Sequence, residues 1–326
     1  MSNEVDSTGE FPPAGSPALG QGLEPLVHEA CNDRLGKVIW FRTDWQHGGA
    51  ATGRTEWRTD DGSLHNVVVK LPVSERELRW LRRLQPADGS LPNCGPKLYQ
   101  SGQTLNGYDL AWVIIEWLPV GPLGTHWHED HLHRMCEAAA EFQALAEAHP
   151  IDRAPRLEDW PGLIKRARES VRTQSIDDKS RWKKAHKTIS RQLDGLVERW
   201  RARAPISWMH GDLHLANGMS RDSLERGPVC LIDFAEVHPG HWVEDAVYLE
   251  RLNWARPERL KNASPVKLLA EARKERGLDN GDDHPILADL RRALYAATAP
   301  AFLKTEGGAH LRASLNRLEQ ALQRLK

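Results

Sequence analysis

The segment HGDLHLAN, from His210 to Asn217, together with CLIDFAE, from Cys230 to Glu236, decides the fold. Asp212 and Asn217 lie five positions apart, and Asp233 follows a short apolar segment. A hydroxyl nucleophile needs an acceptor for its proton, and magnesium on a triphosphate needs hard oxygen ligands. Asp212 can supply the first, and Asn217 and Asp233 the second. Each residue alone would be interpreted as a helix cap or a solvated turn residue. The combination, with apolar segments on both sides, favours a role in catalysis and metal binding.

A second informative segment lies upstream. NVVVKLP, residues 66–72, is a β-branched run that predicts a strand carrying Lys70, where a lysine can contact a phosphate. The next segment, SERELRWLRRLQ, predicts a helix with Ser74 as its N-cap. Glu77 can complete a capping box with Ser74 or form an ion pair with Lys70. We favour the ion pair, with Glu75 as the alternative partner if the register differs.

A glycine-bearing loop precedes the lysine strand. Two strand-like segments, residues 37–44 and 55–59, flank Gly48 and Gly49, where backbone amides can approach a phosphate. An ordinary hairpin loop would have a similar composition. The loop gains its interest from its place directly before Lys70.

Between the two motif clusters, LAWVIIEWLPVGPL predicts a buried strand that ends in a Pro/Gly linker. We expect this linker to join two lobes and the backbone groups of Glu116 and Leu118 to pair with a nucleotide base. The alternative is a core strand followed by a turn. Because the contacts would be made by the main chain, the side chains do not decide between the two.

Over residues 35–250 these segments resemble the aminoglycoside phosphotransferase and choline kinase-like family. The resemblance implies an α+β, two-lobed protein kinase-like fold, with a small antiparallel-sheet N-lobe and a larger, mainly helical C-lobe. It also implies ATP and Mg as cofactors, with GTP not excluded. Carried over by position, it makes Asp212 the catalytic base, Asn217 and Asp233 the magnesium ligands, and Lys70, held by Glu77, the contact to the α- and β-phosphates.

Two further positions refine the resemblance. Asp245, in VEDAVYLE, matches a family segment that supports the site. Gly211 stands where protein kinases have the Arg of H-R-D, and the short stretch between Asp233 and Asp245 leaves no room for an activation loop. The sequence therefore predicts a kinase for small molecules and disfavours a protein kinase.

The rest of the chain fits one two-lobed enzyme. Residues 1–25 are rich in Gly, Pro and Ser and predict a flexible tail, residues 26–118 the nucleotide-binding N-lobe, and residues 119–326 the C-lobe with the catalytic loop. Apolar stripes predict helices over 129–149 and 181–204, and leucines from Leu311 to Leu325 predict a terminal helix that packs on its own lobe or forms a dimer seam. A monomer and a homodimer are both compatible with this pattern.

Composition excludes several classes of protein. The net charge of −1, with interspersed basic and acidic residues, gives no sign of nucleic-acid binding. No apolar run is long enough for a membrane span, and the first residues do not resemble a signal peptide. Four cysteines without paired spacing suit free thiols in the cytoplasm.

We therefore expect a phosphotransferase that moves the γ-phosphate of ATP to a hydroxyl of a small molecule, such as an aminoglycoside, an amino alcohol or a sugar. Acidic candidates for acceptor contacts are Glu158 with Asp159, and the group Asp279, Asp282 and Asp283, which also read as exposed turns. The alternative is a pseudokinase that binds nucleotide or acts as a scaffold without turnover. The presence of Lys70 and all three catalytic-loop groups argues against that alternative.

Overall fold

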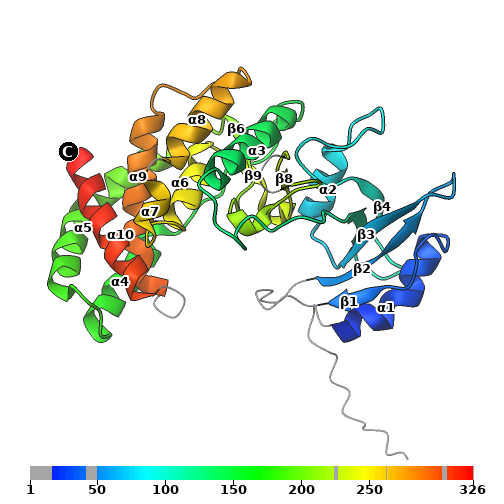
Figure 1. Ribbon diagram of the computed structural model, residues 1–326. Helices are drawn as coiled ribbons and strands as arrows, with labels where there is room; N and C mark the ends of the chain where they lie inside the picture. Colours follow the sequence, from blue (N-terminus) through cyan, green and yellow to red (C-terminus); the bar gives the residue numbers. More distant parts are fainter. Residues whose placement is uncertain (1–16, 42–49, 224–226, 262, 303–306, 326) are drawn as a thin grey trace, which may run out of the picture. The chain divides into compact units, whose positions relative to one another are not determined.

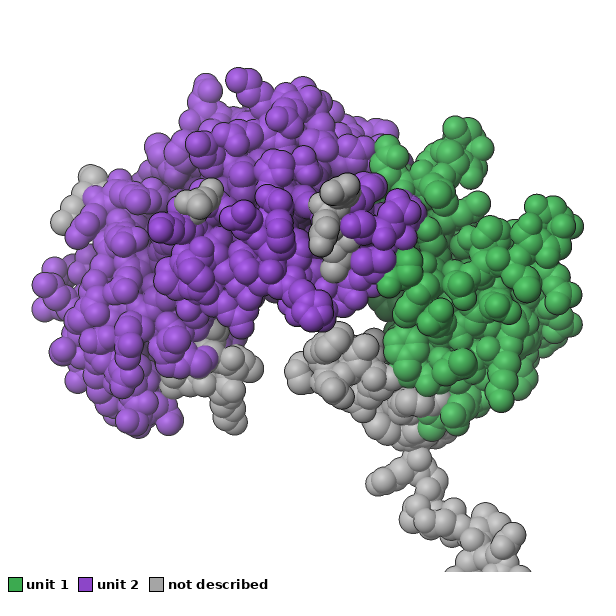
Figure 2. All heavy atoms as spheres, in the orientation of Figure 1, with its two compact units in different colours: residues 1–119 green, residues 120–326 purple. Residues whose placement is uncertain are grey.

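The computed structural model describes residues 17–41, 50–223, 227–261, 263–302 and 307–325 (Figure 1). The chain divides into two compact units, residues 1–119 (unit 1) and 120–326 (unit 2), coloured separately in Figure 2. The elements of unit 1 are α1 (Pro17–Ala30), β1 (Ile39–Phe41), β2 (Ala51–Arg58), β3 (Leu64–Leu71), α2 (Glu75–Arg83), β4 (Leu98–Gly102) and β5 (Trp112–Glu116).

Unit 1 is built on an antiparallel sheet of five strands in the order β1-β2-β3-β5-β4 (Figure 1). Because side chains alternate across a strand, every second residue of β3 reaches the same face. Val67, Val69 and Leu71 are fully buried, whereas Val68 and Lys70 are half-buried. The valine run therefore supplies the core on one face and presents Lys70 on the other.

Helix α1 covers the core face of this sheet (Figure 1). Its Val27 is fully buried and belongs to one cluster with Val67 and Ile114, and Leu23 and Leu26 pack against that cluster. The sequence-based prediction of a flexible tail up to residue 25 is therefore wrong for residues 17–25, which are helical, and residues 1–16 lie outside the described residues. The prediction relied on the Gly, Pro and Ser content and overlooked the apolar stripe of Leu23, Leu26 and Val27, which packs against the sheet.

Unit 2 is mainly helical. Two short antiparallel pairs, β6 with β9 and β7 with β8, carry the loops of the candidate site. The helices and strands of this unit are α3 (His131–Ala146), α4 (Trp160–Thr173), α5 (Lys179–Arg201), β6 (Ser207–Met209), η1 (Leu215–Asn217), β7 (Gly218–Met219), β8 (Cys230–Leu231), η2 (Phe234–Glu236), β9 (His238–Gly240), α6 (Val243–Arg251), α7 (Pro257–Leu260), α8 (Pro265–Glu275), α9 (His284–Thr298), η3 (Ala299–Phe302) and α10 (Gly308–Arg324).

The helices predicted over 129–149 and 181–204 are confirmed as α3 and α5. The terminal leucines lie on α10, which packs against α9 and α5 (Figure 1). Leu311, Leu315, Leu318 and Leu322 are all buried within this one chain. The leucine stripe therefore packs inside unit 2. This is the first of the two interpretations of the pattern, a terminal helix that packs on its own lobe.

Two expectations from composition concern the chain as a whole. The four cysteines are free, as predicted, and all four are buried. Among the described helices, none is long and apolar enough to cross a membrane.

Candidate active site

Lys70 and Glu77 form the ion pair that the sequence predicts. Nζ of Lys70 lies 2.5 Å from Oε1 of Glu77, and the two side chains are 19% and 5% exposed. The N-cap of α2 is also present, because the Ser74 hydroxyl accepts a hydrogen bond from the backbone N–H of Glu77 at 3.1 Å. The favoured ion pair is therefore confirmed, and Glu77 takes part in the helix cap through its backbone N–H while its carboxylate binds the lysine.

The end of β5 differs from the expected hinge. The backbone N–H of Glu116 donates to the Lys97 carbonyl at 2.8 Å, and the Glu116 carboxylate accepts from the Lys97 N–H at 3.0 Å. The prediction that the backbone groups of Glu116 are available to a base is therefore wrong for its N–H, because β4 and the residue before it pair there. Among the described residues, the N–H of the buried Leu118 has no hydrogen-bond partner. Gly48 and Gly49 lie outside the described residues.

In unit 2, Asp245 holds the start of the loop that carries Asp212 and Asn217. One of its carboxylate oxygens accepts the His210 N–H at 2.8 Å and the other accepts the Gly211 N–H at 2.9 Å. The side chain comes from α6 and is 1% exposed, and this burial raises the pKa of the carboxyl. The structural support that the resemblance implied for Asp245 is thus a clamp on two consecutive backbone amides.

Gly211 has a left-handed backbone, with φ of +82°. A Cβ atom built there would overlap the backbone oxygen of Glu236 and approach the His238 ring. Both the positive φ and the close approach require glycine. The local backbone at this position therefore excludes the arginine of H-R-D.

His210 ties the loop to the second motif. Its fully buried ring packs against Phe142 and Phe234, with ring centroids 6.3 and 5.4 Å away. Nε2 lies 3.0 Å from the Ile232 carbonyl, and Nδ1 accepts the Asp212 N–H at 3.4 Å. Since a carbonyl only accepts, Nε2 carries the proton, and burial lowers the pKa of the imidazole, which keeps it neutral. The ring therefore fixes the loop beside the segment that carries Asp233.

The carboxylate of Asp212 is surrounded by donors. Oδ1 accepts the Tyr248 hydroxyl at 2.8 Å, Oδ2 accepts the Asn217 amide at 3.3 Å, and His214 Nε2 lies 3.3 Å from Oδ2. Partial burial would raise the pKa of Asp212, but the hydrogen bonds and charge of His214 and the Tyr248 hydroxyl outweigh it and hold the pKa at about 2. Asp212 is therefore ionised across the physiological range of pH.

Tyr248 is a site residue that sequence reasoning missed. It lies on α6, one helical turn after Asp245, so both side chains reach the catalytic loop from one face of the helix. The signal that could have found it is this spacing, because Asp245 had already been assigned to the support of the loop.

Asn217 and Asp233 lie at the same end of the β7–β8 pair. The Ile232 N–H donates to the Asn217 carbonyl at 3.0 Å, which places Asp233 one residue beyond that bond. The Asn217 amide nitrogen donates to Asp212, so its side-chain oxygen remains as an acceptor. Asp233 is exposed and has a left-handed backbone, with φ of 64°, a strained conformation typical of functional sites.

These groups fit a magnesium ion that is also bound by phosphate. Magnesium takes hard oxygen ligands and is usually held by one or two protein side chains, with phosphates and water completing the shell. Asn217 and Asp233 offer an amide oxygen and a carboxylate of this kind. Within the described part of the chain, no cluster of three or more His, Cys, Asp or Glu side chains is arranged to hold a metal alone.

A cavity of about 580 Å³ opens beside Asp212 within unit 2. Glu158, one of the acidic residues proposed for acceptor contacts, lines it, whereas its neighbour Asp159 caps α4 by accepting the Gly162 N–H at 2.9 Å. Acidic, basic and aromatic side chains share the wall: Arg156, Glu158, Trp160, Asp212, Glu236, His238, Tyr248, Arg251, Arg291, Tyr295 and Phe302.

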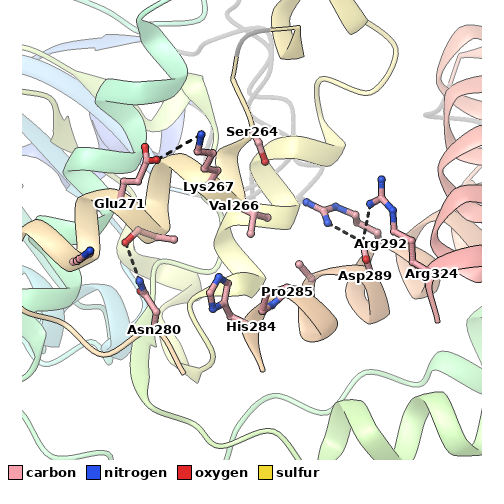
Figure 3. Close-up of a pocket in the computed structure, with 13 residues that line it drawn as sticks. Ser264, Val266, Lys267, Glu271, Asn280, His284, Pro285, Asp289, Arg292 and Arg324 are labelled. Atoms are coloured by element: carbon pink, nitrogen blue, oxygen red, sulfur yellow. Dashed lines mark hydrogen bonds and ion pairs between the residues drawn. The ribbon is translucent and has the colours of Figure 1, made fainter. Parts of the chain in front are cut away.

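A second cavity, of about 530 Å³, lies between α8 and α9 and reaches the end of α10 (Figure 3). Lys267 pairs with Glu271 at 3.8 Å, and Asp289 accepts from both Arg292 and Arg324 (Figure 3). The second acidic candidate, the loop with Asp279, Asp282 and Asp283, contributes its neighbours Asn280 and His284 to this cavity. No residue predicted for catalysis lines it, so it is separate from the candidate active site.

A five-stranded sheet with a lysine–glutamate pair, and a helical unit with an Asp-Asn loop and a following Asp, define the protein kinase-like class of phosphotransferases. Within that class, the chain belongs to the APH phosphotransferase enzyme family, whose model matches residues 46–290. No curated protein matches the chain in sequence.

Solved structures share this fold at low sequence identity. An aminoglycoside phosphotransferase from Alicyclobacillus acidocaldarius is 13% identical, with a TM-score of 0.58 over 99% of this chain and 97% of the other. A putative aminoglycoside phosphotransferase from Ralstonia eutropha is 13% identical, with a TM-score of 0.55 over 93% and 99%. A microcompartment-associated aminopropanol kinase is 16% identical, with a TM-score of 0.54 over 93% and 95%. The predicted fold class is confirmed.

Proposed function

We propose that this protein transfers the γ-phosphoryl group of ATP, with magnesium, to a hydroxyl of a small molecule. The observation that carries the proposal is the direct bond between Asp212 and Asn217. The loop thereby presents the carboxylate of Asp212 to the cavity. It also presents the side-chain oxygen of Asn217 at the end of the β7–β8 pair, next to Asp233. In this proposal unit 1 is the nucleotide-binding lobe and unit 2 the catalytic lobe.

Asp212 orients the attacking hydroxyl by accepting its hydrogen bond. With a pKa of about 2, its carboxylate is a weak base before the reaction, so it receives the proton only as the hydroxyl oxygen bonds to phosphorus. Phosphoryl transfer through a loose transition state depends mainly on positioning and charge stabilisation, which suits this role. Tyr248, His214 and Asn217 hold the carboxylate in place for it.

The remaining residues serve the nucleotide and the metal. Lys70, held by Glu77, contacts the α- and β-phosphates, and the N–H of Leu118 with the carbonyl of Glu116 pairs with the base. Gly48 and Gly49 are assigned to the phosphates from the sequence alone. Asn217 and Asp233 hold magnesium, which supplies positive charge that stabilises the transferring phosphoryl group.

Relatives with the same fold support a nucleotide and a small acceptor. A spectinomycin phosphotransferase with a TM-score of 0.50 was solved with ADP and spectinomycin. At 12% identity, the two proteins share the fold alone. That this chain also uses a nucleotide donor and a small-molecule acceptor is part of our proposal.

The test is ADP release from ATP and magnesium in the presence of hydroxyl compounds, comparing the native protein with Asp212→Asn. We expect the substitution to lower kcat by about 10²- to 10⁴-fold, because it removes the proton acceptor. Asp177→Asn makes the same chemical change at an exposed site outside the cavity and serves as the matched control. Nucleotide binding without turnover on any acceptor would favour the pseudokinase, and no nucleotide binding would refute the proposal.

A further inference from the structure

His238 lies in the wall of the cavity beside Asp212, and both of its ring nitrogens face oxygen acceptors. Nδ1 lies 2.8 Å from the backbone carbonyl of Glu236, and Nε2 lies 3.6 Å from Oε2 of Glu244. A neutral imidazole has one N–H and one lone pair, whereas an imidazolium has two N–H groups. Since a carbonyl and a carboxylate only accept, this placement favours the doubly protonated, charged ring.

The carboxylate that faces His238 is itself a fixed charge. The side chain of Glu244 is 3% exposed, and its Oε1 accepts hydrogen bonds from Nε of Arg203 at 2.9 Å and from the His241 N–H at 3.0 Å. Burial would raise the pKa of this carboxyl, but His238, Arg291 and Arg203 outweigh it and hold the pKa at about 2. Glu244 is therefore ionised at neutral pH, with Oε2 turned to His238.

The surroundings of His238 also raise its own pKa. Burial would lower this pKa, but the hydrogen bond and charge of Glu244, together with the Glu236 carbonyl, outweigh burial. Arg291 is the cation that competes with His238 for Oε2 of Glu244, and at 3.9 Å it lies farther from that oxygen. The other charged side chains near this pair, from the elements packed around it, are Arg156, Arg203, Asp212, Glu236 and Asp245.

His238 connects the segment after Asp233 with the helix that holds Asp212. The carbonyl that it contacts ends η2, which begins directly after Asp233, and this carbonyl also packs against the backbone of Gly211. Glu244, on the other side of the ring, lies on α6, the helix that holds the loop of Asp212. The ring, the Glu236 carbonyl and the Glu244 carboxylate thus form a charged link between η2 and α6.

We propose that His238 is a positioning residue of the phosphotransfer, whose imidazolium holds the Glu236 carbonyl against the loop of Asp212 and ties it to Glu244. The inference rests on the proposed function and adds a group to it. His238 acts through Asp212, which still receives the proton of the attacking hydroxyl. When the ring loses its charge, a lone pair on Nε2 faces the carboxylate of Glu244, and the link between η2 and α6 weakens.

The first experiment compares ADP release by the native chain and by His238→Gln at a series of pH values from 6 to 10. Glutamine is polar but carries no charge at any of them. We expect kcat of the native chain to exceed that of the variant by about tenfold near pH 6, since one charge-assisted hydrogen bond contributes that much. The KM for ATP should be the same in both, because the charged link holds the loop of Asp212.

The pH dependence is what separates positioning by charge from mere packing. The pKa of His238 lies above its ordinary value of 6.5, so the advantage of the native chain is present at pH 6 and is lost as pH rises through the raised pKa. The ratio of the two kcat values should therefore fall toward one in the alkaline range. A ratio that stays constant from pH 6 to pH 10 overturns the inference.

His128→Gln is the matched control for this substitution. His128 also lies beside a carboxylate, with Nδ1 3.5 Å from Oδ2 of Asp130, but it is exposed and lies outside the cavity. We expect this variant to have the kcat of the native chain at every pH. The control thereby removes the general effect of exchanging one histidine for glutamine.

The second experiment needs no turnover. Two-bond correlation spectra of the full chain, labelled with nitrogen-15 in histidine, show which ring nitrogens carry protons. The signals of His238 are those that disappear in His238→Gln. We expect both of its nitrogens to be protonated at pH 7. A neutral His238 at pH 7 overturns the inference whatever the activity, and this measurement on the native chain stands even if the variant does not fold.

The two readouts separate this inference from the proposed function. A charged His238 without ADP release from the native chain supports the charged link and contradicts phosphotransfer. ADP release with a neutral His238, or with a constant ratio of kcat values, supports phosphotransfer and refutes the positioning role.

Discussion

The candidate residues of unit 1 and those of unit 2 are held by different kinds of interaction. In unit 1, a carboxylate holds one side chain, because Glu77 pairs with Lys70. In unit 2, a carboxylate holds the main chain, because Asp245 accepts hydrogen bonds from two consecutive backbone N–H groups. Asp245 itself does not line the cavity. The first arrangement fixes one charge, whereas the second fixes the path of the loop that carries Asp212. Loss of the second arrangement should therefore lower the free energy of unfolding more, and it should disturb more residues, than loss of the first.

The largest effect is expected from removing the clamp. Asp245→Ala leaves the buried N–H of His210 and the half-buried N–H of Gly211 without acceptors, which should lower the free energy of unfolding by about 2–4 kcal/mol. Urea denaturation measures this loss. The rate of ADP release should also fall, because Asp212 is the next residue after Gly211 and would lose its position. Asp177→Ala, at an exposed position, is the control. A loss no greater than that of the control would remove the distinction between the two units.

A smaller and more local effect is expected in unit 1. In a double-mutant cycle of Lys70→Met and Glu77→Gln, we expect a coupling of about 1–2 kcal/mol in the free energy of unfolding, because the pair is largely buried. Both single variants should raise the KM for ATP. If the coupling exceeded the whole effect of Asp245→Ala, the comparison would be reversed.

The smallest effect is expected at the hydroxyl that reaches Asp212. Tyr248→Phe removes one hydrogen bond, which should cost about 1 kcal/mol near neutral pH and raise the pKa of Asp212 from about 2 toward its ordinary value of 3.8. The folded-state pKa lies below the unfolded one, so the stabilisation by Asp212 is complete above about pH 4 and is lost as pH falls toward 2.

The measurement is the difference in unfolding free energy between the native chain and Tyr248→Phe at pH 6 and pH 3. We expect the difference to shrink at the lower pH. A difference that stays constant would mean that Tyr248 stabilises α6 by packing and does not act through Asp212.

The proximity of Asp212 and Asn217 was predictable because both residues lie within one short stretch of sequence. Asp212, Asn217 and Asp233 were named from the sequence, and the Lys70–Glu77 pair followed from a strand and a helix that are neighbours in the chain. What the sequence did not reveal depends on distant partners. Tyr248 reaches Asp212 across 36 positions, and Arg291 reaches Glu158 across 133.

The other differences have the same origin. The N–H of Glu116 is used by a neighbour of β4, a strand that the sequence did not predict, so its pairing could not be anticipated. Residues 17–25 were predicted to be a tail because the sheet against which Leu23 packs is formed by later segments of the chain. Local patterns specify elements, but only the assembled sheet specifies which faces and amides remain available.

The glycine at position 211 also limits how this protein could be regulated. Protein kinases gain control by phosphorylation through an arginine at the equivalent position, which responds to a modified loop. Here the Glu236 carbonyl fills the place where that arginine's first carbon would stand. A single substitution at this position could not install such a switch, because any side chain there would require the backbone of residues 211 and 236 to move apart first.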